Sequence, residues 1–562
     1  MKTDKTLVPK QAQSSEWSAE DQASGLDASV MGGSLAGSIW TVVSRLTGMF
    51  RVLVVGAVLG ATYLGNTYQT LNSLPNLVFY QLLAGSLFAS ILVPPLVRHV
   101  DAGDRLGAQK LVGRFLGTLL LIGAAFTLVL LALSPVIMRL LTIGSGPTVA
   151  AAQSRVGLLL LALFVPQILF YTVVGTAAAA MNAYGRFALA AAAPALESLG
   201  MIVVLLVVAA VYGTSVDVAN ISNQELLILG LGTTAAVGLH AACQWLGARS
   251  AGVTIVPGLG WRDPEVRQVI RRIGPTLAYT AISGLQLFAV MLVANRVAGG
   301  FVAFNVAMAW YYLPTAIVTW PMARALLPQL ARLHQDGARQ GFRDEFLRSL
   351  ALATMVVVPM AAGLLTLSST LARTLAFGEL DTRAAVTLVS ASLATLMLGV
   401  VFETWFILGS YALYARFDVR SPLYAMATKV GVSLLLMIPA LFVHGAGVLA
   451  VLGLSLTISS LVGATHVWWR LRRDMPRGGY SPAGSIARAL VAAAAMVATT
   501  GLVARAFSGA PAGHARGLAE LAVAGIAGLG AYVAVLVALR APEIGWLRSD
   551  MRHINPLSGR RW

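Results

Sequence analysis

Two arginines lie inside the first long apolar segment of the chain, over about residues 33–64. Arg45 and Arg51 are six residues apart, which on an α-helix gives an angular offset of about 120° and an axial separation of about 9 Å. An arginine near the middle of a bilayer costs at least about 2.5 kcal/mol, so it usually faces a water-filled path for a substrate or ion. The spacing therefore predicts that both guanidinium groups face one polar interior. The alternative is that one or both side chains extend to the cytoplasmic headgroups.

Three acids and a lysine also lie in apolar segments: Glu197, Glu403, Glu520 and Lys429. A cation-coupled exporter would need such acids to face its cavity and bind a proton or sodium, but these three are dispersed along the chain. We expect Glu403 either to pair with Lys429 as a structural bridge or to act as a coupling site. Glu197 is a candidate for the same two roles.

The composition of the chain indicates that these charged residues belong to a membrane protein. Of 562 residues, 57% are hydrophobic and only 11% are charged, which is too apolar for an ordinary soluble fold. The apolar segments reach about 20 residues, the length at which a helix crosses the hydrocarbon, and no alternating pattern favours a barrel. We expect an all-α polytopic membrane protein with about fourteen spans. Cys243 is the single cysteine, so neither a disulfide framework nor a cysteine metal site is expected, and no cofactor is predicted.

The net charge of +17 is interpreted as a topology signal. Most of the Lys and Arg residues fall in the even-numbered loops and the two tails, which places both termini in the cytoplasm. Contact with membrane lipids of the cytoplasmic leaflet is a secondary effect, and no nucleic-acid partner is expected.

The order of spans predicts two lobes. The sequence around Pro94 and Arg98 resembles that around Pro328 and Arg332, and Tyr184 to Phe187 resembles Tyr414 to Phe417 at nearly the same offset. Two six-helix units with parallel orientation are typical of transporters with a site between the lobes. We expect a disordered cytoplasmic tail (1–30), an N-terminal lobe (31–248), a cytoplasmic linker with an amphipathic helix (249–273), a C-terminal lobe (274–470), a basic loop (471–484), helices 13 and 14 (485–540) and a basic tail (541–562).

Several motifs together resemble the MurJ/MviN family of lipid II flippases, which belongs to the multidrug/oligosaccharidyl-lipid/polysaccharide exporter superfamily. They cover about residues 33–470 and are Ser44-Arg45-x-x-Gly48-x-x-Arg51, Leu74-Pro75-Asn76-Leu77, Pro94, Asn182 to Phe187 with Ala193-Pro194, Leu326-Leu327-Pro328, and Tyr414 to Pro422. The chain departs from the family pattern where charged residues are usual. The substituted positions are Val52, Thr67, Phe79, Tyr80, Ala84 and Ala309.

The resemblance implies a flippase that moves lipid II from the inner to the outer leaflet of a bacterial cytoplasmic membrane by alternating access, in peptidoglycan biosynthesis. Arg45 and Arg51 are then expected to clamp the pyrophosphate, because the guanidinium fork pairs bidentately with phosphate oxygens and stays charged when partly desolvated. Arg324 would be a third cation from the opposite lobe. Asn76 would bind sugar hydroxyls, or else pack between helices.

The driving force stays open between membrane potential, sodium and protons. Two negative charges moving outward across 100 mV would gain about 4.6 kcal/mol. The missing family charges leave open another polyprenyl-pyrophosphate-linked glycan as cargo. Further alternatives are a cation-coupled multidrug exporter, a membrane glycosyltransferase, and a non-transporting scaffold in a cell-wall synthesis complex.

Overall fold

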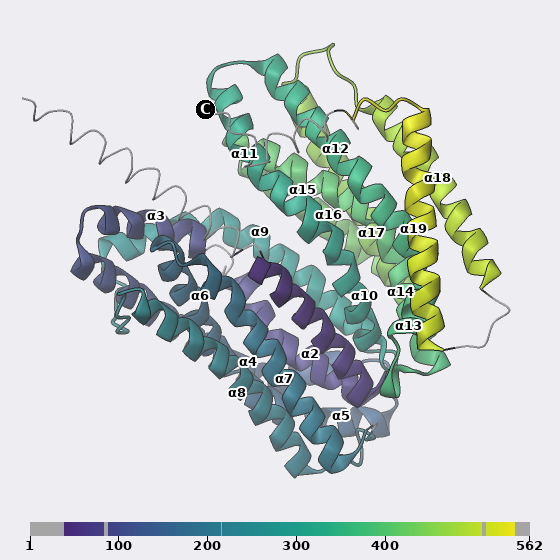
Figure 1. Ribbon diagram of the computed structural model, residues 1–562. Coiled ribbons are helices and arrows are strands. Elements are labelled where there is room, and N and C mark those ends of the chain that lie inside the picture. The colour runs from purple at the N-terminus through teal and green to yellow at the C-terminus, as the bar shows by residue number, and fades with distance from the viewer. Residues whose placement is uncertain are drawn as a thin grey trace, which may run out of the picture.

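The computed structural model describes residues 37, 39–83, 88–214, 216–507, 513–543 and 545. The regular secondary structure within these ranges is helical. Figure 1 shows two helix bundles that meet at one end, near α2, α10 and α13, and diverge toward the end where α3 and α11 lie. The predicted tail at 1–30 and most of the predicted basic tail at 541–562 lie outside the described residues.

The first bundle contains the N-terminal helices of the chain. Its elements are the first helix (Ile39–Leu59), α2 (Tyr63–Leu77), the π-helical turn η1 (Val78–Leu82), α3 (Phe88–Asp101), α4 (Arg105–Leu141), α5 (Pro147–Phe164), α6 (Gln167–Ala183), α7 (Phe187–Tyr212) and α8 (Asn223–Ser250). The long α4 starts at Asp104, whose side chain caps Gly107 N at 2.8 Å. This hydrogen bond and the neighbouring His99 hold the pKa of Asp104 below its ordinary value.

The second bundle contains the remaining helices. They are α9 (Pro264–Ala294), α10 (Gly300–Pro314), the π-helical turn η3 (Thr315–Thr319), α11 (Trp320–Gln335), α12 (Arg339–Thr366), α13 (Ser368–Leu375), α14 (Arg383–Met397), α15 (Val400–Ala415), α16 (Arg420–Met437), α17 (Ala446–Arg473), α18 (Ala483–Ala506) and α19 (His514–Ala538). The short 3₁₀ turns η4 (Gly378–Leu380) and η5 (Ile438–Leu441) lie between them. α18 and α19 pack together and against α12 and α13 at the outer side of this bundle (Figure 1).

The linker between the bundles does not form a separate helix over its second half. Residues 253–260 run along α4, where Gly258 N donates to Gly113 O at 3.0 Å and Gly260 N donates to Thr118 Oγ1 at 3.2 Å. From Pro264 onward the chain is already α9, which packs against both α4 and α16. The predicted linker helix is therefore, from residue 264, the first part of a spanning helix.

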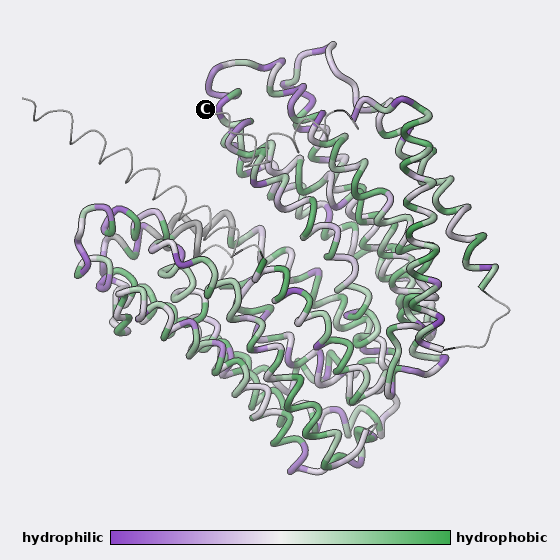
Figure 2. The backbone as a smooth tube through the Cα atoms, in the orientation of Figure 1, coloured by the Kyte–Doolittle hydropathy of each residue, from purple (hydrophilic) through white to green (hydrophobic). Residues whose placement is uncertain are grey.

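The distribution of hydropathy fits a polytopic membrane protein. Figure 2 shows hydrophobic residues along the helices and hydrophilic residues gathered toward their ends. Among the described residues, twelve helices are long and apolar enough to cross a membrane, or thirteen if the bent pair α14 and α15 counts as one span. The predicted second span is not among them, because it is divided into α2, η1 and α3. The all-helical membrane fold is confirmed.

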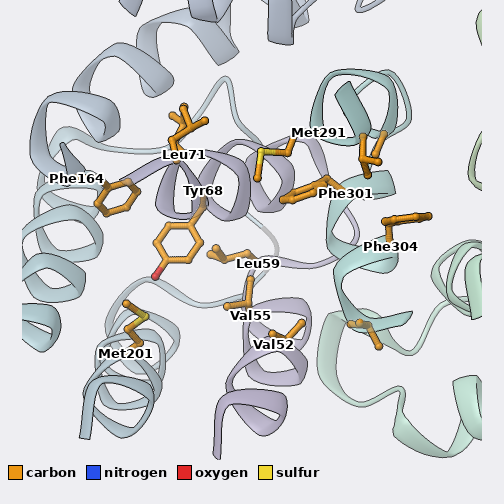
Figure 3. Close-up of a cluster of buried hydrophobic side chains, with 14 of the residues drawn as sticks. Val52, Val55, Leu59, Tyr68, Leu71, Phe164, Met201, Met291, Phe301 and Phe304 are labelled. Carbon is orange, nitrogen blue, oxygen red and sulfur yellow. The ribbon is translucent and has the colours of Figure 1, made fainter. Parts of the chain in front are cut away.

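The two bundles share an apolar core at the end where they meet. Figure 3 shows side chains of the first helix and α2 converging with side chains of the second bundle: Val52, Val55, Leu59, Tyr68, Leu71, Met291, Phe301 and Phe304. Tyr68 is fully buried and its hydroxyl pairs with Thr233 Oγ1 at 2.7 Å. This core closes the molecule at one end.

Polar bonds between the bundles reinforce the closed end. Asn66 of α2 is fully buried and its Oδ1 accepts from the backbone N–H groups of Phe301 at 2.9 Å and Val302 at 3.3 Å. These are the first N–H groups of α10, whose own N-cap is Gly299 and has no side chain to offer. Asn66 therefore caps a helix of the opposite bundle. A second bond across the bundles joins Asn295 Nδ2 to Thr70 Oγ1 at 2.8 Å.

Candidate functional site

A cavity of about 940 Å³ lies between the two bundles. Its wall is formed by the first helix, α2, η1, α6, α7 and α8 on one side and by α9, α10, η3 and α11 on the other. Two π-helical turns, η1 and η3, border the cavity, and each follows a proline, Pro75 or Pro314. Such turns interrupt regular helices and often occur at functional sites.

Arg45 and Arg51 both line this cavity. Between them, Gly48 faces α7, where a Cβ would make ordinary contact with Ser198 Oγ at 3.8 Å. The two arginines therefore line one cavity between the bundles, and their role in binding stays a prediction.

The guanidinium group of Arg51 is poorly satisfied by the protein. Its Nη1 donates to the thioether sulfur of Met201 at 2.9 Å, which is a weak acceptor, and its Nε is buried without a partner. Among the described residues, no carboxylate lies within ion-pair distance of Arg45 or Arg51. This setting of Arg51, with the exposed Arg45 on the same cavity wall, favours an anionic ligand.

One carboxylate lines the same cavity. Glu197 of α7 accepts from the Tyr171 hydroxyl at 2.9 Å through Oε1, and its Oε2 lies 2.8 Å from His240 Nδ1. Tyr171 on α6 and His240 on α8 also line the cavity. Sequence reasoning identified Glu197 but missed His240, although a histidine inside an apolar segment is a detectable signal.

Asn76 and several aromatic side chains also face the cavity. Asn76 is exposed at the end of α2, directly before η1, where it lines the wall together with Tyr80. Tyr312 and Trp320 line the opposite wall. These positions leave the expected sugar-binding role of Asn76 as a prediction. A polar amide beside aromatic rings suits a saccharide, since rings stack on sugars while the amide bonds their hydroxyls.

Arg324 does not lie where it was expected. It is exposed on α11, beside the Tyr411 hydroxyl, and is not among the residues that line the cavity. The expectation assumed one regular helix through this region. On α11, Trp320 lines the cavity, and Arg324 follows it by four residues, about 6 Å further along the helix axis.

The other charges in the spans lie away from the cavity. Lys429 Nζ forms an ion pair with Glu403 Oε2, and Ser460 Oγ donates to the same oxygen at 2.8 Å. Lys429 also lies 4.7 Å above the ring of Phe406. Glu520 on α19 accepts from Thr370 Oγ1 at 2.7 Å. The geometry of Lys429 and Glu403 agrees with the structural bridge, one of the two roles left open for them.

Comparison with known proteins gives one family. The family model described as "Lipid II flippase MurJ" matches residues 55–513. A probable lipid II flippase MurJ of Rhizobium meliloti is 28% identical over 490 residues, which span 84% of this chain and 87% of that protein. A probable lipid II flippase MurJ of Vibrio cholerae is 26% identical over 349 residues, 59% of this chain and 62% of that protein's length. The family match begins after Arg45 and Arg51, so their roles rest on the geometry.

Solved structures show the same fold. A lipid II flippase MurJ in an inward closed conformation superposes with a TM-score of 0.67 at 16% identity, covering 90% of this chain and 99% of that one. An inward-facing multidrug resistance transporter of the MATE family, in the MOP superfamily, superposes with a TM-score of 0.61 at 14% identity, covering 78% of this chain. At these identities the likeness concerns the fold alone.

Proposed function

The chain belongs to the lipid II flippase MurJ family, and we propose that it carries lipid II across the cytoplasmic membrane through the cavity between its two bundles. The family is one of transporters, and the apolar helices make this chain a multi-pass membrane protein. The cargo is then a lipid-linked saccharide whose pyrophosphate is anionic. The observation that supports the proposal best is the pair Arg45 and Arg51 on the cavity wall, without a carboxylate partner among the described residues.

In this mechanism the arginines hold the headgroup while the polyprenyl tail remains in the bilayer. Each guanidinium can donate two parallel hydrogen bonds to phosphate oxygens. Met201 sulfur is the present partner of Arg51 Nη1, and a phosphate oxygen would be a far stronger acceptor. Asn76, Tyr80 and Tyr312 border the space that remains for sugar units.

The closed end of the molecule supports alternating access. The basic ends of α3 and α11 lie where the bundles diverge (Figure 1), and basic residues favour the cytoplasmic side. The end held by Asn66 and Asn295 would then be an outward gate, and the cavity would receive cargo from the inner leaflet. Opening this gate while the other end closes would deliver the headgroup to the outer leaflet. In the proposed topology both termini face the cytoplasm.

The alternative functions require different charges in the wall of the cavity. A flippase for another polyprenyl-pyrophosphate-linked glycan would use the same two arginines. A cation-coupled multidrug exporter would need an acidic cavity, whereas this cavity has two arginines and one glutamate in its wall. The source of energy remains a choice between membrane potential, sodium and protons, and docking to a cell-wall synthesis complex is a separate expectation.

The test is complementation of a bacterial host depleted of its own lipid II flippase. We expect the wild-type chain to restore growth and Arg45→Ala and Arg51→Ala to fail at equal expression. Arg324→Ala is the matched control, because it removes an arginine from a spanning helix outside the cavity and should still restore growth. Failure of a well-expressed wild-type chain would reject lipid II as the cargo. Rescue by the Arg45→Ala/Arg51→Ala double variant would remove the clamp from the mechanism.

A further inference from the structure

The cavity wall carries a carboxylate and an imidazole that the arginine clamp does not use. Glu197 has 13% of its side chain exposed, while His240 has 2%. The two groups come from neighbouring helices, α7 and α8, and form an ion pair if the histidine is protonated. We propose that Glu197 and His240 form a proton-binding pair, and that binding of a pyrophosphate at Arg45 and Arg51 is accompanied by uptake of one proton there. This inference rests on the proposed function.

The hydrogen bonds around His240 provide a partner for each of its charge states. In the neutral ring, Nδ1–H donates to Glu197 Oε2, and Nε2 faces Gln244 Nε2 at 3.5 Å. Gln244 Nε2 also donates to Ala190 O at 3.0 Å, so its amide nitrogen is the atom turned toward the ring. With the amide in this orientation its nitrogen donates and Nε2 of His240 accepts, which corresponds to the neutral ring.

When His240 is protonated on both ring nitrogens, its Nε2–H needs a hydrogen-bond acceptor. Gln244 Oε1 is buried and has no hydrogen-bond partner. A proton added to Nε2 of His240 could be accepted by this oxygen after rotation of the amide, while Nδ1–H keeps its bond to Glu197. The proton comes from water and stays on the ring, and no covalent bond between heavy atoms changes. This rotation takes the Gln244 amide nitrogen away from Ala190 O, so protonation exchanges that bond for one from His240 Nε2–H to Gln244 Oε1, while the bond to Glu197 is kept.

The charges that line the cavity supply the reason for proton uptake. Without cargo, the described residues of the wall include two arginines and one glutamate, a net charge of one positive unit. A pyrophosphate diester brings two negative charges and leaves the loaded cavity one unit negative. A proton on His240 makes the loaded cavity neutral. Because uncompensated charge is costly in a partly enclosed, low-dielectric space, bound pyrophosphate and bound proton should stabilise each other.

The other groups around the pair do not compete for this proton. Arg51 of the first helix acts on Glu197 through its charge and stays protonated. Tyr171 on α6 donates to Glu197, and Tyr80 on η1 lies within electrostatic range of it. Tyrosine hydroxyls are neutral near pH 7. We therefore assign the added proton to the pair of Glu197 and His240.

The experiment is calorimetric titration of the purified full chain with UDP-N-acetylglucosamine. This probe is a soluble pyrophosphate diester whose phosphates do not titrate near pH 7. Repeating the titration in buffers of different ionisation enthalpy measures the protons taken up on binding. We expect uptake of up to one proton per ligand near pH 7, and an affinity that falls by up to about tenfold per pH unit as the pH rises through the titration of the pair.

Variants separate the pair from the rest of the site. Glu197→Gln and His240→Gln should bind without proton uptake and with an affinity that no longer depends on pH. Glu225→Gln is the matched control, since Glu225 is a buried acid on the same helix as His240 but outside the cavity wall. It should take up protons like the wild type. Unchanged uptake in both Glu197→Gln and His240→Gln would overturn the proposal.

If Glu197→Gln or His240→Gln fails to fold, titration of the wild-type protein and of Arg51→Ala still tests the proposal. Arg51-dependent binding without proton uptake would overturn the proton-binding pair and leave the flippase proposal standing. If the wild type bound no probe, or bound it equally well after Arg51→Ala, the anionic site itself would be rejected and the proposed mechanism with it.

Discussion

The charged residues in the spans fall into paired and unpaired groups. Lys429 and Glu403 are joined to each other and to Ser460, away from the cavity. Arg45 and Arg51 have no such carboxylate and face the cavity. A buried pair satisfies its own charges, whereas an unpaired cation in a cavity needs water or a ligand. Both groups are charged side chains within spanning segments. The neighbouring side chains decide whether such a charge is paired or faces the cavity.

We predict that Glu403→Leu destabilises the protein, because it leaves the Lys429 ammonium buried without its partner. Loss of one member of a buried ion pair costs about 3–5 kcal/mol. The double variant Glu403→Leu/Lys429→Leu should recover most of that loss. Denaturant unfolding of the purified chain in detergent measures both. If the stable double variant could not support growth in the depleted host, Glu403 would belong to the transport cycle.

Breaks and caps in the helices position the cavity wall. η1 follows Pro75 and η3 follows Pro314, and each adds a turn of different register to a spanning segment. The start of α10 depends on the other bundle, because Asn66 accepts from its first N–H groups. A helix end capped across an interface couples the order of the helix to the closure of that interface.

Asn66→Ala should therefore weaken the closed end. It leaves two backbone N–H groups of α10 without an acceptor, at a cost of about 1–3 kcal/mol, whereas Asn66→Asp keeps the acceptor and loses only the bond from Nδ2 to Val297 O at 2.7 Å. Spin labels at Thr214 and Glu379, which hydrogen-bond across the two bundles at 2.6 Å, can report the closure in a Cys243→Ser background. We expect a longer distance population in Asn66→Ala and a smaller one in Asn66→Asp. An unchanged distribution in Asn66→Ala would show that the apolar core alone holds the end closed.

The whole molecule is a pair of bundles joined at one end around a cavity of about 940 Å³. The joined end combines apolar packing, shown in Figure 3, with hydrogen bonds from Asn66 and Asn295. A closed end and an accessible cavity in one structure represent one state of a two-state transporter, so transport requires that these contacts separate.

Holding the joined end closed should stop transport without stopping binding. We predict this result for Thr214→Cys/Glu379→Cys in a Cys243→Ser background, treated with a reducible thiol crosslinker. Flipping of labelled lipid II in vesicles should cease and should return after reduction, while UDP-N-acetylglucosamine still binds. The uncrosslinked double variant is the control. Continued flipping in the fully crosslinked protein would exclude alternating access through this end.

The sequence by itself determined the membrane class, most of the spans and the family, whereas the expected second span is divided into α2, η1 and α3. Apolar runs of about 20 residues have few alternatives to spanning helices, because every backbone group must be bonded within the segment. It also identified Arg45 and Arg51 as candidate functional residues, since a charged side chain in an apolar run is costly in any orientation. These inferences depend on local composition, which the fold does not alter.

The tertiary structure alone decided which charges meet. Arg324 was expected at the cavity but lies beside Tyr411, one turn of α11 beyond the cavity-lining Trp320. The pairing of Glu197 with His240 joins residues of α7 and α8 that local spacing does not relate. Asn66 caps a helix because the first turn of α10, in the opposite bundle, lies against its side chain. Contacts between helices depend on their relative rotation and separation, and hydropathy along one chain segment does not contain that information.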